Sequence, residues 1–388
     1  MTRRRLVDAA LIVVALAWTA WWVADVWPIS GLSWHFFVSG SHDLLKTDGL
    51  SVYAHHPELQ MGPLPLAVAG IFGVLPSSAA KAVALVVMTL IGLIMLALLA
   101  PIVPAGRRRP RMLLAALFFL PAWTVLSVRW GHLDDVLAIA AAVCAVVAVA
   151  QRRPVLTGVA LGVAMASKPW AVGFVPLILA LPRERLRAAG AALGTAAVAW
   201  LPFILGDTGT MSALHPPVAL APGSGLRTLG ARGSVVPAWG RTVQLLLTPA
   251  AALAVAWTRR WAGVLLVAIA VRMVLDPQDN AYYIGSAAMA AVVFDLLGTR
   301  SLIPWTTMLT VVLLWQPFVR DYTHRLTTTT GLTHWWFAHQ GAVGWVHLAW
   351  AAAVVAIVML VPPSSLPIDR RREDSPPLPA PVAPPALP

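Results

Sequence analysis

The chain has 388 residues, carries a formal net charge of +12, and is 59% hydrophobic but only 11% charged, with a mean hydropathy of +0.77. This composition excludes a water-soluble globule, whose surface needs a larger share of polar residues. Apolar runs near the roughly 20 residues needed to cross a bilayer recur along the chain. These runs are continuous rather than alternating, so they indicate helices. The sequence therefore predicts an all-α protein that crosses a membrane many times.

The positive charge follows the connectors between the apolar runs. Arginines cluster at every second connector: Arg3, Arg4, Arg5, Arg107, Arg108, Arg109, Arg111, Arg152, Arg153, Arg183, Arg185, Arg187, Arg259, Arg260, Arg300, Arg370, Arg371 and Arg372. By the positive-inside rule, arginine-rich connectors remain in the cytoplasm. We therefore expect a multi-pass protein of the plasma membrane with both termini in the cytoplasm, and we expect no nucleic-acid partner.

Twelve transmembrane helices are predicted when arginines mark inner helix ends and Trp and Tyr mark the membrane interfaces. They cover residues 7–27, 80–101, 112–128, 135–151, 155–167, 169–181, 188–205, 241–257, 261–276, 281–297, 302–318 and 343–361. The fifth and sixth are too short to span alone and meet at Ser167, Lys168 and Pro169. We expect them to form a hairpin or a broken pair that does not face lipid.

The predicted membrane domain, residues 1–361, has its long loops on the outer side. These loops cover residues 28–79, 206–240 and 319–342. Within the first, residues 63–76 are apolar but too short to cross, so we expect a helix along the interface. Residues 362–388 are rich in proline and are expected to form a disordered cytoplasmic tail.

Metal and disulfide chemistry find little support. Cys144 is the only cysteine and falls in a predicted helix, so the chain offers no intramolecular disulfide and no cysteine cluster. Several outer histidines invite a metal interpretation: His55, His56, His324, His334 and His339. Their spacings do not match a helical ligand pair such as i, i+4. We expect no metal and no other cofactor.

The most informative stretch is RWGHLDD at 129–135, which precedes Lys168 in an apolar, helix-breaking segment. A lysine is costly to bury in a membrane, so Lys168 should face a polar cavity and meet an anion such as a lipid phosphate. The alternative is that Lys168 extends to the outer headgroups or pairs with Asp134 or Asp135. Outer acids and histidines near this segment make an extracytoplasmic site the expected place for chemistry.

A second cation lies near the outer end of a later helix, in VRMVLDPQDNAYY at 271–283. Arg272 could bind a phosphate, and the alternative is an i, i+4 ion pair with Asp276. Asp279 and Tyr282 are candidates for substrate binding, although Tyr282 also fits the aromatic belt at a membrane interface. Trp34, in the first outer loop, is a candidate for stacking on a sugar.

The order of RWGHLDD, QRRP, TGVALGVAMASKPW and VPLIL resembles the polyprenyl-phosphate-sugar-dependent glycosyltransferases of the GT-C fold, especially the family 87 mannosyltransferases of actinobacteria. In that family a tryptophan-glycine-glutamine turn precedes a helix, a basic connector and a glycine-rich helix that ends in Lys-Pro. The matching positions are Trp130, Gly131, Asp134, Gly158, Gly162, Lys168 and Pro169. His132 stands where the family usually has glutamine.

The first outer loop extends this resemblance, which covers about residues 28–297 and is specific only as an ordered set. Its matching positions are Phe37, Leu44, Leu45, Gly49, Tyr53, Pro57, Gly62 and Pro63. Where the family carries an aspartate that resembles a catalytic base, this chain has Ser33. A serine does not by itself accept a hydroxyl proton at neutral pH.

Three interpretations of Ser33 stay open. A neighbouring residue acts as the base, the register of the resemblance is shifted, or the protein binds without catalysing. The neighbours that could act as the base are Asp43, Asp48, Glu58 and His35.

The resemblance implies a GT-C-like bundle that moves a sugar, with mannose the expected one, from a polyprenyl-phosphate donor to a glycolipid or cell-envelope glycan on the outer face. Lys168 and Arg272 would bind the donor phosphate. The other substrate-binding residues would be Trp34, Tyr53, His132, Asp134, Asp135, Asp279 and Tyr282. One alternative is a transporter or flippase of lipid-linked sugars, which often shows two related halves and charges at mid-membrane. The other is a catalytically silent relative in an envelope-synthesis complex.

Overall fold

The computed structural model describes residues 3–105, 108–213, 217–315, 334–335 and 338–362. Within these ranges the chain is helical, and its only β-type pairing is a single bridge between Ala219 and Val235. The predicted all-α class is therefore confirmed for the described part of the chain.

A helix is present at each of the twelve predicted positions. The helices are α1 (Arg3–Val26), α5 (Ser77–Leu99), α6 (Arg108–Thr124), α7 (Leu133–Ala150), α8 (Pro154–Ser167), the 3-10 helix η6 (Pro169–Ala180), α9 (Arg185–Gly206), α12 (Ala238–Trp257), α13 (Val264–Leu275), α14 (Tyr283–Gly298), α15 (Trp305–Leu314) and α18 (Gln340–Leu360). The order of helices along the chain thus follows the prediction.

Fewer helices than the twelve predicted are long enough to cross a membrane alone. Six helical segments are long and apolar enough to cross a membrane: Ala9–Ile29, Ser77–Ile102, Arg108–Trp130, Leu133–Ala150, Arg185–Gly206 and Gln340–Leu360. α8 and α15 have 14 and 10 residues and therefore extend only about 15–21 Å, less than the roughly 30 Å of hydrocarbon. The structure supports a membrane-type bundle but does not confirm twelve crossings.

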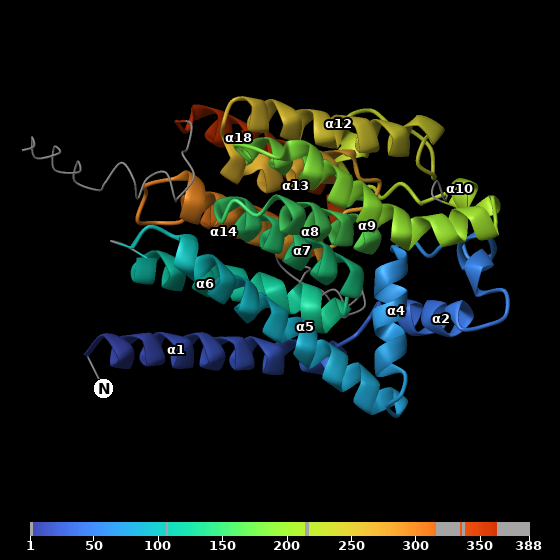
Figure 1. Cartoon of the computed structure of the whole chain (residues 1–388), viewed down its shortest axis with the longest axis horizontal. Helices are drawn as coiled ribbons and strands as arrows, with labels where there is room; N and C mark the ends of the chain where they lie inside the picture. The colour runs from blue at the N-terminus through green and yellow to red at the C-terminus, as the bar shows by residue number, and fades with distance from the viewer. Residues whose placement is uncertain (1–2, 106–107, 214–216, 316–333, 336–337, 363–388) are drawn as a thin grey trace, which may run out of the picture.

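The long helices run side by side, and the ends of the bundle differ. In Figure 1 the start of α1, the connector between α5 and α6 and the connector between α14 and α15 lie at the left, whereas α2 (Trp34–Leu44) and α10 (Gly209–Ala213) lie at the right. The left-hand segments are arginine-bearing in the sequence. The predicted inner connectors shown here therefore gather at one end of the molecule.

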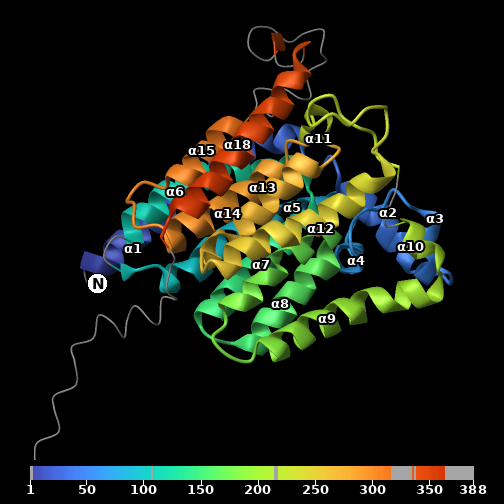
Figure 2. The ribbon, with the colours of Figure 1, turned by 90° about the horizontal axis from the view of Figure 1, so that it is seen from above.

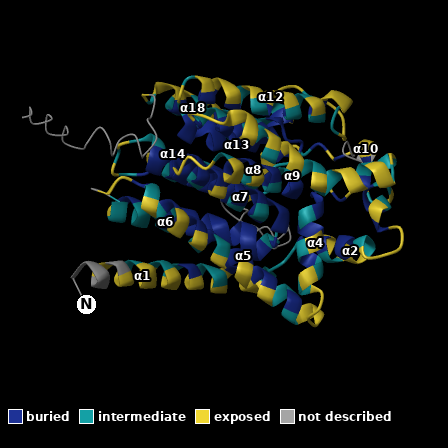
Figure 3. Ribbon diagram, viewed as in Figure 1, coloured by how far each residue is buried: buried dark blue, intermediate teal, exposed yellow. Residues whose placement is uncertain are grey.

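Burial increases from the edge of the bundle to its centre. Only 11% of the span in α1 and 17% of that in α9 is buried inside the protein, compared with 72% for Arg108–Trp130 and 78% for α7. Figure 3 shows α13 and α14 mostly buried, and Figure 2 shows α9 along the periphery. Because exposed positions of α1 and α9 are largely apolar, these helices are suited to face lipid.

The first outer loop folds into short helices. α2, α3 (Val52–His55) and α4 (Pro63–Phe72) follow one another within residues 28–79. α4 lies across the direction of α1 and α5 in Figure 1, as expected for a helix along the interface. A further short helix, α11 (Gly225–Thr228), lies in the second outer loop. The predicted loop 319–342 and tail 362–388 fall mostly outside the described residues.

The predicted break between the fifth and sixth helices is present. α8 ends at Ser167, Lys168 is extended (φ −149°, ψ 121°), and η6 begins at Pro169. Proline disfavours a helical conformation at the residue before it, which explains the extended lysine. Ala171, Phe174 and other apolar residues of η6 are fully buried, so η6 does not face lipid.

The first member of this broken pair, α8, packs closely on α9. A Cβ added at Gly158 would lie 2.1 Å from the Ala188 carbonyl oxygen, and one at Gly162 would lie 2.4 Å from the Thr195 Cβ. Small residues four apart allow two helices in a membrane to approach closely. Val155 and Leu156, in the first turn of α8, are about half exposed, so this helix, unlike η6, also reaches the outside of the bundle.

Candidate functional site

Backbone hydrogen bonds join the first outer loop to the two most informative sequence segments. The amides of Gly31 and Ser33 donate to the carbonyls of Val128 (2.9 Å) and Trp130 (2.7 Å) in the π-helix η5 (Val125–Trp130) that follows α6. The amide of Gly62 donates to the carbonyl of Ser167, at 2.8 Å. Loop 28–79, RWGHLDD and Lys168 therefore lie together, and π-helices are frequent at functional sites.

The turn after η5 directs the acidic residues inward. Gly131 has φ +60°, a left-handed conformation that favours glycine, and α7 begins two residues later. Asp134 and Asp135 occupy the first turn of α7 and are at most 1% exposed. Carboxylates are stabilised at this end of a helix because the helix dipole is positive there.

Lys168 pairs with both of these carboxylates. Its Nζ forms a close ion pair with Asp134 and lies 3.6 Å from Asp135 Oδ2. His132 Nδ1 lies 2.5 Å from Asp134 Oδ1 and 3.0 Å from Asp135 Oδ2. A buried charge is costly unless it is paired. The alternative in which Lys168 pairs with an aspartate is therefore confirmed, and a phosphate would have to share this lysine with two carboxylates.

The same aspartates and histidine have the composition of a metal site. One ligand atom from each of His132, Asp134 and Asp135 lies within 4.8 Å of the others. Imidazole and carboxylate are ordinary ligands of divalent metals. Lys168 binds the same carboxylate oxygens and supplies a positive charge to them. A cation would therefore have to compete with the lysine.

Arg272 forms a second buried charged cluster at the end of α13. Its Nη2 lies 3.3 Å from Asp276 Oδ2, and its guanidinium lies between the rings of Trp170 (4.4 Å) and Tyr283 (4.2 Å). Asp276 also accepts hydrogen bonds from Tyr283 Oη (3.1 Å) and Gln244 Nε2 (3.3 Å). The i, i+4 ion pair is confirmed, and the two aromatic faces stabilise the guanidinium further.

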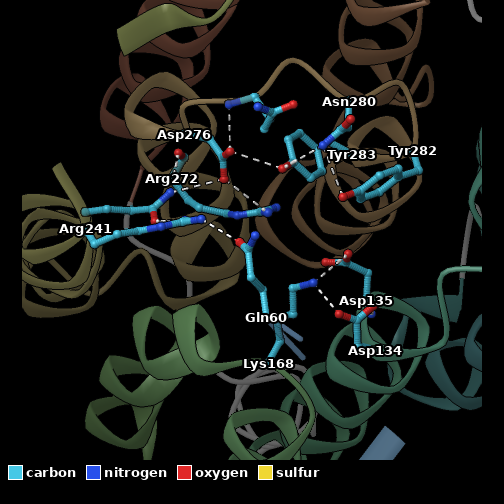
Figure 4. A network of polar contacts seen from close by, with 12 residues as sticks. Gln60, Asp134, Asp135, Lys168, Arg241, Arg272, Asp276, Asn280, Tyr282 and Tyr283 are labelled. Carbon is cyan, nitrogen blue, oxygen red and sulfur yellow. Dashed lines mark hydrogen bonds and ion pairs between the residues drawn. The ribbon is translucent and has the colours of Figure 1, made fainter. Parts of the chain in front are cut away.

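These clusters face a cavity of about 350 Å³. It is built from the first residues of α7, η6, α12 and α14 and the last residues of α13. Its polar and aromatic wall comprises Ser33, Phe36, Glu58, Gln60, Trp130, His132, Asp134, Lys168, Trp170, Trp200, Arg241, Gln244, Arg272, Asp276, Gln278, Asn280, Tyr282 and Tyr283. Figure 4 shows Arg241 and Arg272 extending in the same direction, with Gln60 beside Arg241, and Lys168 pointing to Asp134 and Asp135. A cavity with converging polar groups is the usual form of a small-molecule site.

Two of the four candidate bases, Asp43 and Asp48, form ion pairs within the first outer loop and do not line the cavity. Asp43 contacts Lys46 Nζ at 2.6 Å and His56 Nε2 at 3.4 Å, and Asp48 lies 3.7 Å from His55 Nδ1. The hydrogen bond from Lys46 lowers the pKa of the Asp43 carboxyl below its ordinary value. This network is suited to hold the first outer loop together.

Of the other two candidate bases, Glu58 lines the cavity and His35 does not. Glu58 lines the cavity, with Oε1 3.1 Å from His56 Nδ1 and a side chain that is 58% exposed. His35 is exposed, does not line the cavity, and packs against the ring of Phe36 at 4.0 Å. Ser33 does line the cavity.

Of the seven predicted substrate-binding residues, some line the cavity and others lie outside its wall. His132, Asp134 and Tyr282 line the cavity, and the Tyr282 ring stacks on the His132 ring at 3.8 Å. The remaining four are outside the wall: Trp34, Tyr53, Asp135 and Asp279.

These four residues are packed against aromatic rings or held among other charged and buried groups outside the cavity wall. Trp34 is 4% exposed and packs on the rings of Phe37 and Phe72. Tyr53 is 2% exposed and packs on aromatic rings of α9. Asp135 lies behind Asp134 in the ion-pair cluster, and burial raises the pKa of Asp279 in the α13–α14 connector. Trp34 and Tyr53 therefore contribute to packing of the first outer loop.

Among the wall residues that were not singled out in the sequence, Arg241, Gln60 and Gln244 are joined by hydrogen bonds. Arg241 Nη2 donates to Gln60 Oε1 at 2.7 Å, and Arg241 Nη1 donates to Gln244 Oε1 at 3.0 Å. A signal for Arg241 exists, because it is an arginine at the predicted outer end of a helix, away from the cytoplasmic clusters. The two glutamines carry no comparable signal.

The cavity thus combines three cations, carboxylates, a histidine and several aromatic rings. These groups can bind a phosphate, orient a sugar by stacking and hydrogen bonds, and accept a proton. Searches against protein-family models and against curated protein sequences find no match for this chain.

Proposed function

We propose that the protein transfers a sugar, with mannose as the expected one, from a polyprenyl-phosphate donor to a glycolipid or cell-envelope glycan. The observation that supports this proposal is the cavity that Arg241, Arg272, Lys168 and His132 line together with several aromatic rings. Such a site combines positive charge for a phosphate leaving group with a group able to accept a proton.

The proposed reaction is a displacement at the anomeric carbon of the donor sugar. The acceptor hydroxyl oxygen forms a bond to that carbon, and the bond between the carbon and the phosphate oxygen breaks. The electron pair remains on the phosphate oxygen, so polyprenyl phosphate leaves with increased negative charge. The hydroxyl proton moves to a base on the protein. Fixed cations near the phosphate lower the barrier because they stabilise the charge that develops there.

His132 is the proposed base. Its Nδ1 contacts Asp134 and Asp135, so the proton acceptor is assigned to Nε2, the other ring nitrogen. A carboxylate bound to one nitrogen of a histidine fixes the ring and stabilises the protonated form. Glu58, the one other proposed base on the cavity wall, lies at a more exposed position. Asp134 and Asp276 each face a lysine or arginine, which makes them weaker bases.

The proposed topology places the cavity outside the cell. The arginine-bearing connectors shown at one end of Figure 1 would lie in the cytoplasm, together with both termini. The short helices α13 and α14, which are mostly buried, would complete the multi-pass bundle within the protein interior. Membrane lipids, the donor and the glycan acceptor are the proposed partners.

A transfer assay tests the proposal. Membranes that contain the protein receive radiolabelled polyprenyl-phosphate-mannose and a panel of glycolipid acceptors, and labelled product is separated from donor. We expect product with the wild type and a loss of about 10²–10⁴-fold with His132→Gln. Asp48→Asn, which alters an acid outside the cavity wall, is the matched control and should retain activity.

Two results would count against transfer. Movement of labelled donor between leaflets, without product from any acceptor, would favour the transporter. Donor binding without product or movement would favour a catalytically silent relative, an interpretation that the serine at position 33 of the cavity wall keeps open.

A further inference from the structure

The three cations on the cavity wall differ in how their charge is neutralised. Lys168 pairs with Asp134 and Asp135, and Arg272 pairs with Asp276. Arg241 takes part in none of the ion pairs formed by the described residues. It is therefore the cavity cation whose charge is not balanced by a carboxylate in the described part of the chain.

Neutral side chains hold Arg241 in place. Its Nη2 donates to Gln60 Oε1 at 2.7 Å, and its Nη1 donates to Gln244 Oε1 at 3.0 Å. Gln244 is in turn fixed by its Nε2, which donates to Asp276 Oδ2 at 3.3 Å. A guanidinium has five N–H donors in a planar fork, so donors remain for another acceptor. The arrangement orients a positive charge without neutralising it.

An anion with several oxygens matches this arrangement. Arginine binds phosphate through parallel, charge-assisted hydrogen bonds that are stronger than neutral ones. Arg272, clamped between Trp170 and Tyr283, lies on the same side of the cavity, but Asp276 already balances its charge. The site therefore favours a phosphate group over a neutral sugar.

The outer surface of α12 indicates what the phosphate is attached to. Arg241 and Gln244 line the cavity, whereas Trp239, Leu246 and Leu253, spaced seven residues apart on α12, are 51%, 64% and 45% exposed. Positions seven apart lie on one stripe of a helix. This stripe lies on the face of α12 opposite Arg241. An apolar chain attached to a phosphate at Arg241 would leave the cavity past Leu245, which lines it one turn further along α12, and reach the lipid that the stripe faces, where its burial is favourable.

We propose that Arg241, positioned by Gln60 and Gln244, anchors the phosphate of a lipid-linked ligand, a role the sequence had suggested for Lys168 and Arg272. This inference rests on the proposed function because it assigns the donor phosphate of that reaction. It gives Lys168 a different task, which is to hold the carboxylates of α7 beside His132.

Direct binding tests the assignment. Purified full-length protein in detergent is titrated with radiolabelled undecaprenyl phosphate, and inorganic phosphate and undecaprenol are added as competitors. Arg241→Gln should weaken binding roughly 10–100-fold, since a hydrogen bond to a charged group is lost, and Arg241→Lys should restore part of it. Arg227→Gln is the matched control, because Arg227 is exposed and bonds to the Gly233 carbonyl outside the cavity wall.

A second variant tests the role of Arg241 independently in case Arg241→Gln does not fold. Gln60→Ala keeps the charge but removes one support, and we expect binding to weaken by less than in Arg241→Gln. Undecaprenol should compete poorly, and inorganic phosphate only at high concentration. Equal affinity for inorganic phosphate and the lipid phosphate would overturn the lipid-linked assignment. Wild-type affinity in both Arg241→Gln and Gln60→Ala would overturn the role of Arg241.

The outcomes separate this inference from the proposed function. If Arg241→Gln binds undecaprenyl phosphate like the wild type while the wild type forms product, the inference fails and sugar transfer stands. If binding depends on Arg241 but no acceptor yields product, the inference stands and sugar transfer fails. If the wild type does not bind undecaprenyl phosphate, both fail.

Discussion

Lys168, at the break between α8 and η6, forms a buried ion pair with Asp134, in the first turn of α7 and 34 residues earlier in the chain. The lysine is extended because a proline follows it, and the aspartate sits where the helix dipole favours negative charge. The pair therefore joins the first turn of α7 to the break between α8 and η6, and both residues line the cavity. Its location makes it both a structural link and a support for His132, which contacts the same aspartate.

Removing the lysine should destabilise the fold. Lys168→Met leaves Asp134 and Asp135 buried with only His132 to balance them, and loss of one partner of a buried pair costs roughly 3–5 kcal/mol. The free energy of unfolding can be measured by titration with a denaturing detergent. Lys168→Met combined with Asp134→Asn should recover part of the loss. Lys46→Met, which breaks an exposed pair, should leave the unfolding midpoint nearly unchanged.

The pH dependence of transfer should identify the base. His132 lies between the spans Arg108–Trp130 and Leu133–Ala150. Burial favours its neutral form, but Asp134 and Asp135 outweigh burial, so the pKa of His132 is raised above 6.5. Only the neutral ring accepts a proton, so kcat/KM should fall as pH decreases through this raised pKa.

The matched variants make this pH prediction specific. His132→Gln should remove the fall in kcat/KM that occurs as pH decreases through the raised pKa of His132, and Glu58→Gln should retain it. An acid limb that persists in His132→Gln but disappears in Glu58→Gln would assign the proton transfer to the glutamate instead.

Close packing of α8 on α9 should tolerate no side chain at Gly162. In Gly162→Leu the new Cβ would lie 2.4 Å from Thr195 Cβ and 2.7 Å from the Ala192 carbonyl oxygen. Such overpacking typically costs about 1–3 kcal/mol. Gly190→Ala on α9 is the control, because no atom lies within 4 Å of its added Cβ. A thermal unfolding temperature in Gly162→Leu equal to that of the wild type would contradict the packing of these two helices.

The proposed orientation can be tested with single cysteines. In a Cys144→Ser background, Asp48→Cys should react with a membrane-impermeant thiol reagent on intact cells, because its side chain is exposed on the first outer loop. Arg183→Cys, in the exposed connector before α9, should react only after the cells are opened. The reverse pattern would place the cavity in the cytoplasm and rule out an acceptor on the outer face.

The sequence by itself determined where the helices are. Apolar segments separated by arginines and prolines placed a helix at each of twelve positions, and the break at Lys168 followed from Pro169. These features depend on local chemistry, since hydrophobic length, helix-breaking residues and charge act within a few residues of the chain. The sequence did not establish the number of crossings, because several helices are shorter than the bilayer core.

Only the tertiary structure determined which side chains contact Lys168 and Arg241. Whether Lys168 meets a phosphate or an aspartate depends on how α7 packs against η6, and the geometry gives the aspartate. Arg241 gained its position through Gln60, 181 residues earlier, a contact that no local pattern contains. Side-chain partners far apart in sequence are set by packing of the whole bundle. The charge left unbalanced in the cavity could therefore be located only in the folded protein.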